Sequence, residues 1–203
     1  MSSAFGQYLK LSIFGQSHGE ALGVTLDGFP AGMTIDMEQL LAEMARRAPG
    51  QSLMTTARKE PDAPEFLSGV LNGRTTGQPI CAIIRNTNQR SKDYGDGVDL
   101  VRPGHADYTG HVRYFGFEDW RGGGSFSGRL TAGIVLAGAL CSQYLAHRGV
   151  KIACHIQQLG DVRDASFLAA DAAADYAFLK GMHLPVLTAG LNQQMEETVL
   201  AAR

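Results

Sequence analysis

Polar and apolar residues alternate in the first part of the chain with a period close to two. Residues 9–14 (LKLSIF) and 21–26 show this alternation, which predicts two strands. Two further strands are predicted at 67–71 and 80–84, on either side of the turn dipeptide Asn72-Gly73. Because strands joined by short turns pair antiparallel, the pattern favours an antiparallel sheet over a doubly wound parallel one.

Two segments have the pattern of a helix. Residues 36–47 begin with Asp36, a residue type that caps helix N-termini, and place four apolar residues on one predicted buried face: Met37, Leu40, Leu41 and Met44. Residues 128–148 are apolar on nearly every side, which predicts a central helix buried on several sides and ended by Gly149. Its uncharged part, 130–145, is shorter than the ~20 residues that a bilayer core requires, so we expect the core of a soluble protein.

The C-terminal part predicts one strand and two helices. Residues 150–159 alternate, with Ile152, Cys154 and Ile156 on one face, while 164–177 predict a loose helix and 190–203 a last helix. The last pattern stops with neither glycine nor proline after it, as expected of a chain that has been cut. No repeat or linker divides the sequence, so we expect a single domain over 1–203, incomplete at its C-terminus.

Composition limits the class of protein without naming a function. Of the 203 residues, 44% are hydrophobic and 19% are charged, as is typical of a soluble globular protein. The formal net charge of -2 argues against nucleic acid as a partner. Cys81, Cys141 and Cys154 are widely spaced among apolar residues, which predicts buried reduced thiols in a cytoplasmic protein and no metal site. The N-terminus lacks the apolar core of a signal peptide.

Polar chemistry is concentrated between Arg102 and Gly124. A proline-glycine pair there predicts a rigid loop that presents His105 beside Arg102. An imidazole titrates near neutrality and a guanidinium stays charged, so this pair suits proton transfer next to an anion. The triple glycine at 122–124 precedes the predicted central helix and favours an anion site at the helix start; a tight surface loop is the alternative.

A second histidine and two arginines extend the candidate site. His18 lies between glycines in GQSHG, and together with His105 it makes a two-base proton-transfer site a reasonable hypothesis. A lone His18 would more often be a structural hydrogen-bonding residue. Arg46 and Arg47 lie in the last turn of the first predicted helix, where cations also favour the helix dipole, so a structural role stays open for them.

A colinear series of motifs covers residues 5 to about 162 and has the pattern of one enzyme family. The motifs are FGQSHGEALGVTLDGFPAG at 14–32, RRAPGQS at 46–52, TTARKEPD at 55–62, LSGVLNGRTTGQPI at 67–80, RNTNQRSKDY at 85–94, RPGHADYTG at 102–110 and RGGG at 121–124. In these motifs the chain resembles the N-terminal half of chorismate synthases.

The resemblance implies a fold, a reaction and a cofactor. The expected fold is α+β, with layered antiparallel β-sheets around buried central helices. The expected reaction is the lyase step of the shikimate pathway, in aromatic amino acid biosynthesis, that eliminates phosphate from 5-enolpyruvylshikimate 3-phosphate and yields chorismate. Reduced FMN is the implied cofactor, and NADPH is a candidate reductant of this flavin. A cytoplasmic homotetramer that binds a small-molecule substrate, and neither nucleic acid nor membrane, is also implied.

The resemblance also assigns candidate site residues. His18 and His105 match the two family histidines that act as acids toward the flavin and the substrate. Arg47 and Arg102 match arginines that hold the anionic substrate, and Arg46 adjoins them. A segment that contacts FMN matches Ser125, Phe126 and Ser127.

The sequence departs from the family pattern at five positions in or directly after these motifs. An arginine is usual where Ala48 and Ser125 stand, and a basic residue where Leu53 stands; Phe126 replaces a serine and Leu130 a glutamate. The chain is also shorter than family members, whose second half supplies further site residues. We therefore expect these 203 residues to be inactive alone. The alternative is an impaired or non-catalytic flavin- or anion-binding relative or fragment.

Overall fold

The computed structural model describes residues 4–50, 60–88, 101–167 and 176–202, and in these ranges the chain is an α+β protein. Two compact units divide it: residues 1–49 with 58–147 form unit 1, and 50–57 with 148–203 form unit 2. The expected single domain over 1–203 stays a prediction, since compact units of this kind can belong to one domain. Leu53, one of the departures noted above, lies outside the described residues, as does most of the polar loop after residue 88.

Unit 1 contains a five-stranded sheet in which every neighbouring pair is antiparallel. Its spatial order is β1 (Ala4–Phe5), β2 (Lys10–Gly15), β3 (Ala21–Asp27), β7 (Ile80–Arg85) and β4 (Pro64–Ser68). The strands predicted at 9–14, 21–26 and 80–84 are thus confirmed, and so is antiparallel pairing.

The strand predicted at 67–71 is wrong in its extent. Gly69 has a φ of +77° and separates β4 from the short strand β5 (Val70–Leu71), which pairs with β6 (Arg74–Thr75). The turn between β5 and β6 is Asn72-Gly73, and both residues have positive φ, 50° and 73°. Positive φ at both central residues is the geometry of a type I′ hairpin turn, so the turn predicted at Asn72-Gly73 is confirmed. The strand that follows this turn is β6, however, and not the strand expected at 80–84, which pairs with β4 instead.

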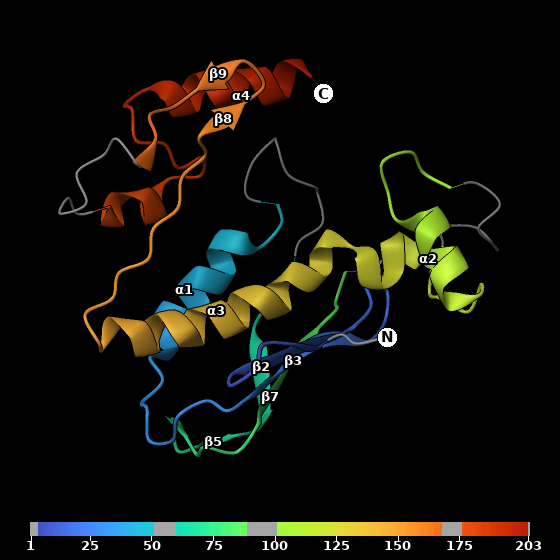
Figure 1. The fold of residues 1–203 in the computed structure, drawn as a ribbon, viewed down its shortest axis with the longest axis vertical. Coiled ribbons are helices and arrows are strands. Elements are labelled where there is room, and N and C mark those ends of the chain that lie inside the picture. Colours follow the sequence, from blue (N-terminus) through green and yellow to red (C-terminus); the bar gives the residue numbers. More distant parts are fainter. Residues whose placement is uncertain (1–3, 51–59, 89–100, 168–175, 203) are drawn as a thin grey trace. The chain divides into compact units, whose positions relative to one another are not determined.

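Helix α3 (Thr131–Ala146) crosses one face of this sheet, and α1 (Met37–Arg47) packs against α3 (Figure 1). A Cβ on Gly133 would lie 3.3 Å from the carbonyl oxygen of Gly23, so this glycine allows the helix to approach β3 closely. The core between these elements consists mainly of aliphatic side chains: Leu22, Val24, Leu26, Leu40, Met44, Ile80, Ala82, Ile84, Leu136 and Leu140. Within the described ranges, one helical segment, Gly128–Ala146, is long and apolar enough to span a membrane, but a core helix meets the same criteria.

The helix predictions need two corrections. The apolar run from 128 begins as a 3-10 turn, η3 (Gly128–Leu130), and becomes α-helical at Thr131. The predicted cap of α1 is confirmed, because Asp36 accepts a hydrogen bond from the Gln39 N–H at 2.9 Å. Of its predicted buried face, Leu40 and Met44 are buried. Met37 and Leu41 are 39% and 43% exposed. The main packing partner of α1 is α3, which covers only one side of the helix.

Unit 2 contains the hairpin β8 (Gln158–Leu159) and β9 (Val162–Arg163), the 3-10 turn η5 (Ala177–Gly181) and α4 (Leu191–Ala201). Helix α4, predicted at 190–203, is confirmed. The strand predicted at 150–159 is wrong for 150–157, which pair with no strand in the described residues, and Cys154 is exposed rather than buried. Residues 168–175 of the predicted loose helix lie outside the described residues.

Candidate functional site

The segment between β2 and β3 holds His18 in a nearly buried position, with 7% of its surface exposed. Its neighbour Ser17 donates its backbone N–H to the carbonyl oxygen of Gly124 at 3.1 Å. Asn86, which follows β7, donates its side-chain amide to the carbonyl oxygens of Gln16 (3.1 Å) and Gly19 (2.8 Å). The segment is therefore fixed from both sides, by the sheet and by the glycine loop.

The triple glycine lies against both candidate histidines. Gly122, Gly123 and Gly124 all have positive φ, in the 3-10 segment η2 (Arg121–Phe126). A Cβ on Gly122 would lie 2.0 Å from Cε1 of His18, and one on Gly123 would lie 2.8 Å from Nε2 of His105. Consecutive Cα atoms are about 3.8 Å apart, so the two imidazoles contact adjacent residues of one loop.

This geometry corrects the role expected of the glycines. The central helix begins at Thr131, and η3 together with residues 125–127 separates it from Gly124. The glycines consequently do not form the N-terminus of that helix, so the helix start gives no support to the anion site expected there, which stays a prediction. Because they have no side chains, Gly122 and Gly123 leave room for the two imidazole rings. Gly124 leaves room for the carbonyl oxygen of Asp119, which would lie 1.8 Å from a Cβ at this position.

Arg102, His105 and Asp107 form one hydrogen-bonded group at the start of α2 (Asp107–Tyr114). Arg102 donates from Nε and NH2 to the two carboxylate oxygens of Asp107, at 2.8 Å each, and from its backbone N–H at 2.9 Å. Nδ1 of His105 lies 2.6 Å from Oδ1 of Asp107. The hydrogen bonds from Arg102, with a smaller contribution from His105, hold the pKa of Asp107 well below its usual range.

Arg46 and Arg47, the other two arginines expected to bind substrate, are both paired with acids of the chain. Arg46 forms an exposed ion pair with Glu43 at 2.6 Å, one turn earlier on α1. Arg47 binds Asp62 at 2.7 Å and also donates to the Thr131 hydroxyl at 3.3 Å. Their role toward a substrate stays a prediction, and neither contacts the two histidines through any bond described here.

Asp62 joins two arginines in the interior of unit 1. Its side chain is fully buried and accepts from NH1 of both Arg47 and Arg129. Arg129, only 4% exposed, also donates from Nε to the Asn86 side chain at 3.0 Å. Its buried NH2 has no hydrogen-bond partner in the described part of the chain. A buried guanidinium nitrogen of this kind requires an acceptor, so the arrangement suits an anionic ligand.

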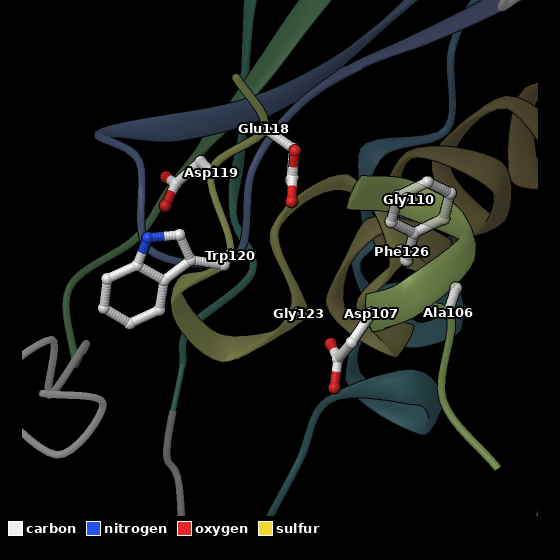
Figure 2. A pocket seen from close by; sticks show the side chains of 8 residues that line it. All are labelled: Ala106, Asp107, Gly110, Glu118, Asp119, Trp120, Gly123 and Phe126. Atoms are coloured by element: carbon white, nitrogen blue, oxygen red, sulfur yellow. The ribbon is translucent and has the colours of Figure 1, made fainter. Parts of the chain in front are cut away.

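The three residues expected to contact FMN differ in their surroundings. Ser125 is exposed, and the Ser127 hydroxyl accepts from the Arg129 N–H at 3.3 Å to cap η3. The Phe126 ring packs on α2, where a Cβ on Gly110 would lie 2.7 Å from it. Phe126 also lines a small pocket (Figure 2), together with Ala106, Asp107, Gly110, Glu118, Asp119, Trp120 and Gly123. Three carboxylates belong to this lining, and each is paired with an arginine or a histidine: Asp107 with Arg102, Glu118 with His111 and Asp119 with Arg121.

Sequence patterns did not single out Asp62, Asn86, Asp107 or Arg129. A usable signal existed for Arg129, because it is the one charged residue of an otherwise apolar run at 128–146. Asp107 lies in the same RPGHAD motif as His105, two positions further on. Asp62 and Asn86 also lie in quoted motifs, TTARKEPD and RNTNQRSKDY, but nothing local in these motifs shows which partners they bind, because those partners are distant in the sequence. In the described residues, no group of three or more histidine, cysteine or acidic side chains is arranged to hold a metal ion.

A family model described as chorismate synthase matches residues 9–203. The chain belongs to the chorismate synthase family. Its α+β fold agrees with a solved structure described as "Crystal Structure of Chorismate Synthase", with a TM-score of 0.67 and 27% sequence identity over 96% of this chain and 53% of that one.

Curated relatives named chorismate synthase agree with this assignment. The protein of Phocaeicola vulgatus is 47% identical over 163 residues, which are 80% of this chain and 45% of that protein. The Ralstonia nicotianae protein is 49% identical over 162 residues, 79% of this chain and 44% of the relative. The Sulfurimonas denitrificans protein is 43% identical over 201 residues, which are 99% of this chain and 54% of that protein. The chain thus spans about half the length of these chorismate synthases.

Proposed function

We propose that this chain carries the histidine-bearing part of a chorismate synthase active site. The reaction is the elimination of phosphate and a ring proton from 5-enolpyruvylshikimate 3-phosphate, which yields chorismate. The observation that carries the proposal is the contact of His18 and His105 with adjacent glycines of one loop. Family membership, from residue 9 to residue 203, supports the choice of reaction.

The two imidazoles have different surroundings and can hold protons at different atoms. Nδ1 of His105 bonds Asp107, so its Nε2 is the atom that exchanges a proton with a ligand. Arg102 lies beside this ring, with its side chain 47% exposed, and supplies positive charge near a departing or bound anion. His18 is the second acid, and its rigid segment keeps it against the glycine loop.

Reduced FMN is part of the proposal, and the chemistry of the described donors fits an anionic cofactor or substrate group. The orphaned NH2 of Arg129 offers a buried charged donor, and the hydroxyls of Ser125 and Ser127 lie a few residues away in sequence. When bound, the reduced flavin supplies electron density without net redox change. NADPH as its reductant, a cytoplasmic location and a homotetramer that binds neither nucleic acid nor membrane complete the proposal by family resemblance.

Two measurements on the 203-residue chain test the proposal. We expect no chorismate from 5-enolpyruvylshikimate 3-phosphate and reduced FMN, because the chain spans about half the length of its relatives. We also expect FMN to bind, and to bind more tightly when this substrate is present. His105→Ala should abolish the substrate-dependent tightening, whereas His147→Ala, on an exposed residue at the end of α3, should not. A chain that binds neither FMN nor the substrate contradicts the proposal.

A non-catalytic flavin- or anion-binding relative is the second candidate. The observation that favours it is the pairing of Arg46 and Arg47 with Glu43 and Asp62, together with the serine at 125 where the family has an arginine. These features leave fewer cations for a multiply charged substrate. The second candidate is the better one if FMN binds but its affinity does not respond to the substrate.

A further inference from the structure

One carboxylate, that of Asp107, organises both the histidine and the arginine of the RPGHAD motif. It contacts Arg102 through both oxygens, and Oδ1 also lies 2.6 Å from Nδ1 of His105. The side chain of Asp107 is 7% exposed, whereas those of Arg102 and His105 are 47% and 26% exposed, so the carboxylate is the covered member of the group. Its position at the first residue of α2 keeps it fixed relative to the loop before it.

The hydrogen-bonding capacity of these groups determines where the protons lie. An ionised carboxylate only accepts hydrogen bonds, and a guanidinium only donates them. NH2 of Arg102 and Nδ1 of His105 are 3.3 Å apart, but both are directed at Oδ1 of Asp107. Nδ1 must therefore carry a hydrogen, and in the neutral ring the lone pair is on Nε2. Nε2 is the ring atom that faces Gly123, next to the glycine that contacts His18.

We propose that Asp107 is a positioning residue that fixes the tautomer and orientation of His105 and holds Arg102 beside it. Its effect on the reaction depends on the proposed function, whereas its effect on the ring does not. Loss of the carboxylate would free the ring to turn and to place its proton on Nε2, the atom that must exchange protons with the ligand.

A second aspartate of unit 1 provides a matched control. Asp119 binds Arg121 through both oxygens, at 2.8 and 2.9 Å, in the same two-bond pattern. No hydrogen bond of Asp119 to a histidine is present in the described residues. Asp107→Asn and Asp119→Asn therefore remove the same charge from the same type of arginine pair. They differ in that Asp107 bonds His105, whereas Asp119 acts on His18 through charge alone.

Nitrogen-15 NMR of histidine-labelled chain tests the inference, with His105→Gln to assign the signals. At pH about 8, where an ordinary imidazole is neutral, wild-type His105 should be mainly the Nδ1–H tautomer. Asp107→Asn should convert most of it to Nε2–H, because the new amide supplies a donor where the carboxylate only accepted, and Asp119→Asn should leave it unchanged. An Nε2–H ring in the wild type, or an unchanged ring in Asp107→Asn, overturns the inference.

A second variant keeps the test decisive if Asp107→Asn does not fold. Arg102→Met removes the guanidinium but leaves the bond between Asp107 and His105, so the Nδ1–H tautomer should persist; conversion to Nε2–H would contradict the inference. The effect on the reaction is read separately from substrate-dependent FMN affinity. Asp107→Asn should reduce that tightening, and unchanged tightening refutes the functional part. Absence of tightening in the wild type counts against the proposed function, whereas the tautomer result still decides the role of Asp107.

Discussion

Replacing Asp62 by asparagine removes the one charge that two arginines share in the interior of unit 1. Asparagine keeps the size and one acceptor oxygen of the side chain, so the change is mainly electrostatic. Asp62 is 0% exposed, and its partners Arg129 and Arg47 are 4% and 18% exposed. Water therefore cannot replace the lost carboxylate. We expect a large loss of folding free energy from this single substitution.

The size of the loss follows from burial and distance. At an effective dielectric constant of about 20, unit charges about 4 Å apart attract each other by about 4 kcal/mol. Removing one partner of a buried ion pair typically costs about 3–5 kcal/mol, because the other charge is left uncompensated. For Asp62→Asn we expect a loss of this order, which is a large fraction of the total stability of about 5–15 kcal/mol common for a domain.

Urea unfolding followed by tryptophan fluorescence reports the stability of unit 1, the part of the chain that contains Asp62. The chain has a single tryptophan, Trp120, and it lies in unit 1. The matched control is Glu65→Gln, which breaks the ion pair between Arg85 and Glu65, whose side chains are 53% and 49% exposed. Water screens an exposed pair of this kind, so the control should lose far less stability than Asp62→Asn.

A result in which Asp62→Asn costs no more than Glu65→Gln would refute this reasoning. It would mean that water or a relaxed backbone solvates the two guanidinium groups. A double variant, Asp62→Asn with Arg129→Met, provides an independent check. Removing one stranded cation should recover part of the lost stability, which would appear as a non-additive cycle.

Three further predictions concern single positions of the chain. Gly122→Ala should lower the free energy of unfolding by at least about 1–2 kcal/mol, because φ is +58° and the new Cβ would overlap the His18 ring. In the same urea assay the control Gly128→Ala, with open space around it, should change this free energy by no more than about 0.5 kcal/mol. Hydrogen bonds from a neighbouring arginine lower the pKa of Asp119, so the stability it contributes is present above the unfolded value of about 3.9 and is lost as pH falls through the folded pKa. Urea titrations of Asp119→Asn and wild type should therefore differ at pH 7 and converge in acid. Cys154 is exposed while the other two thiols are partly buried, so mass spectrometry should find it alkylated first.

Local features of unit 1 could be predicted from the sequence with good detail. The cap at Asp36, the Asn72-Gly73 turn and the strand at 80–84 each depend on dihedral preferences or on a periodicity within a few residues. The apolar run after Gly128 predicted a buried helix because no face of it could be left in water. Its first turn was missed, since the Ser127 cap starts a 3-10 turn before the α-helix.

Predictions that needed a partner were less successful. Residues 150–157 alternate as a strand does, but alternation becomes a strand only where a neighbouring strand offers a ladder of backbone hydrogen bonds. In the described residues this segment has isolated bonds instead, from the Ile156 N–H to the Pro185 carbonyl and from the Asp164 N–H to the Gln157 carbonyl, each 2.8 Å. Met37 and Leu41 were expected to be buried from their spacing on α1. Which face of a helix is covered depends on the elements that pack on it, and here α3 covers Leu40 and Met44.

The sequence by itself determined the family, most elements of unit 1 and the identity of the two candidate histidines. Only the tertiary structure decided that His18 and His105 lie against adjacent glycines, that Asp107 rather than solvent holds the ring of His105, and that Arg47 is bound to Asp62. The reason is physical: periodicity and turn preferences act between neighbours in the chain, whereas the partner of a charge is whichever group the fold brings within about 3 Å of it.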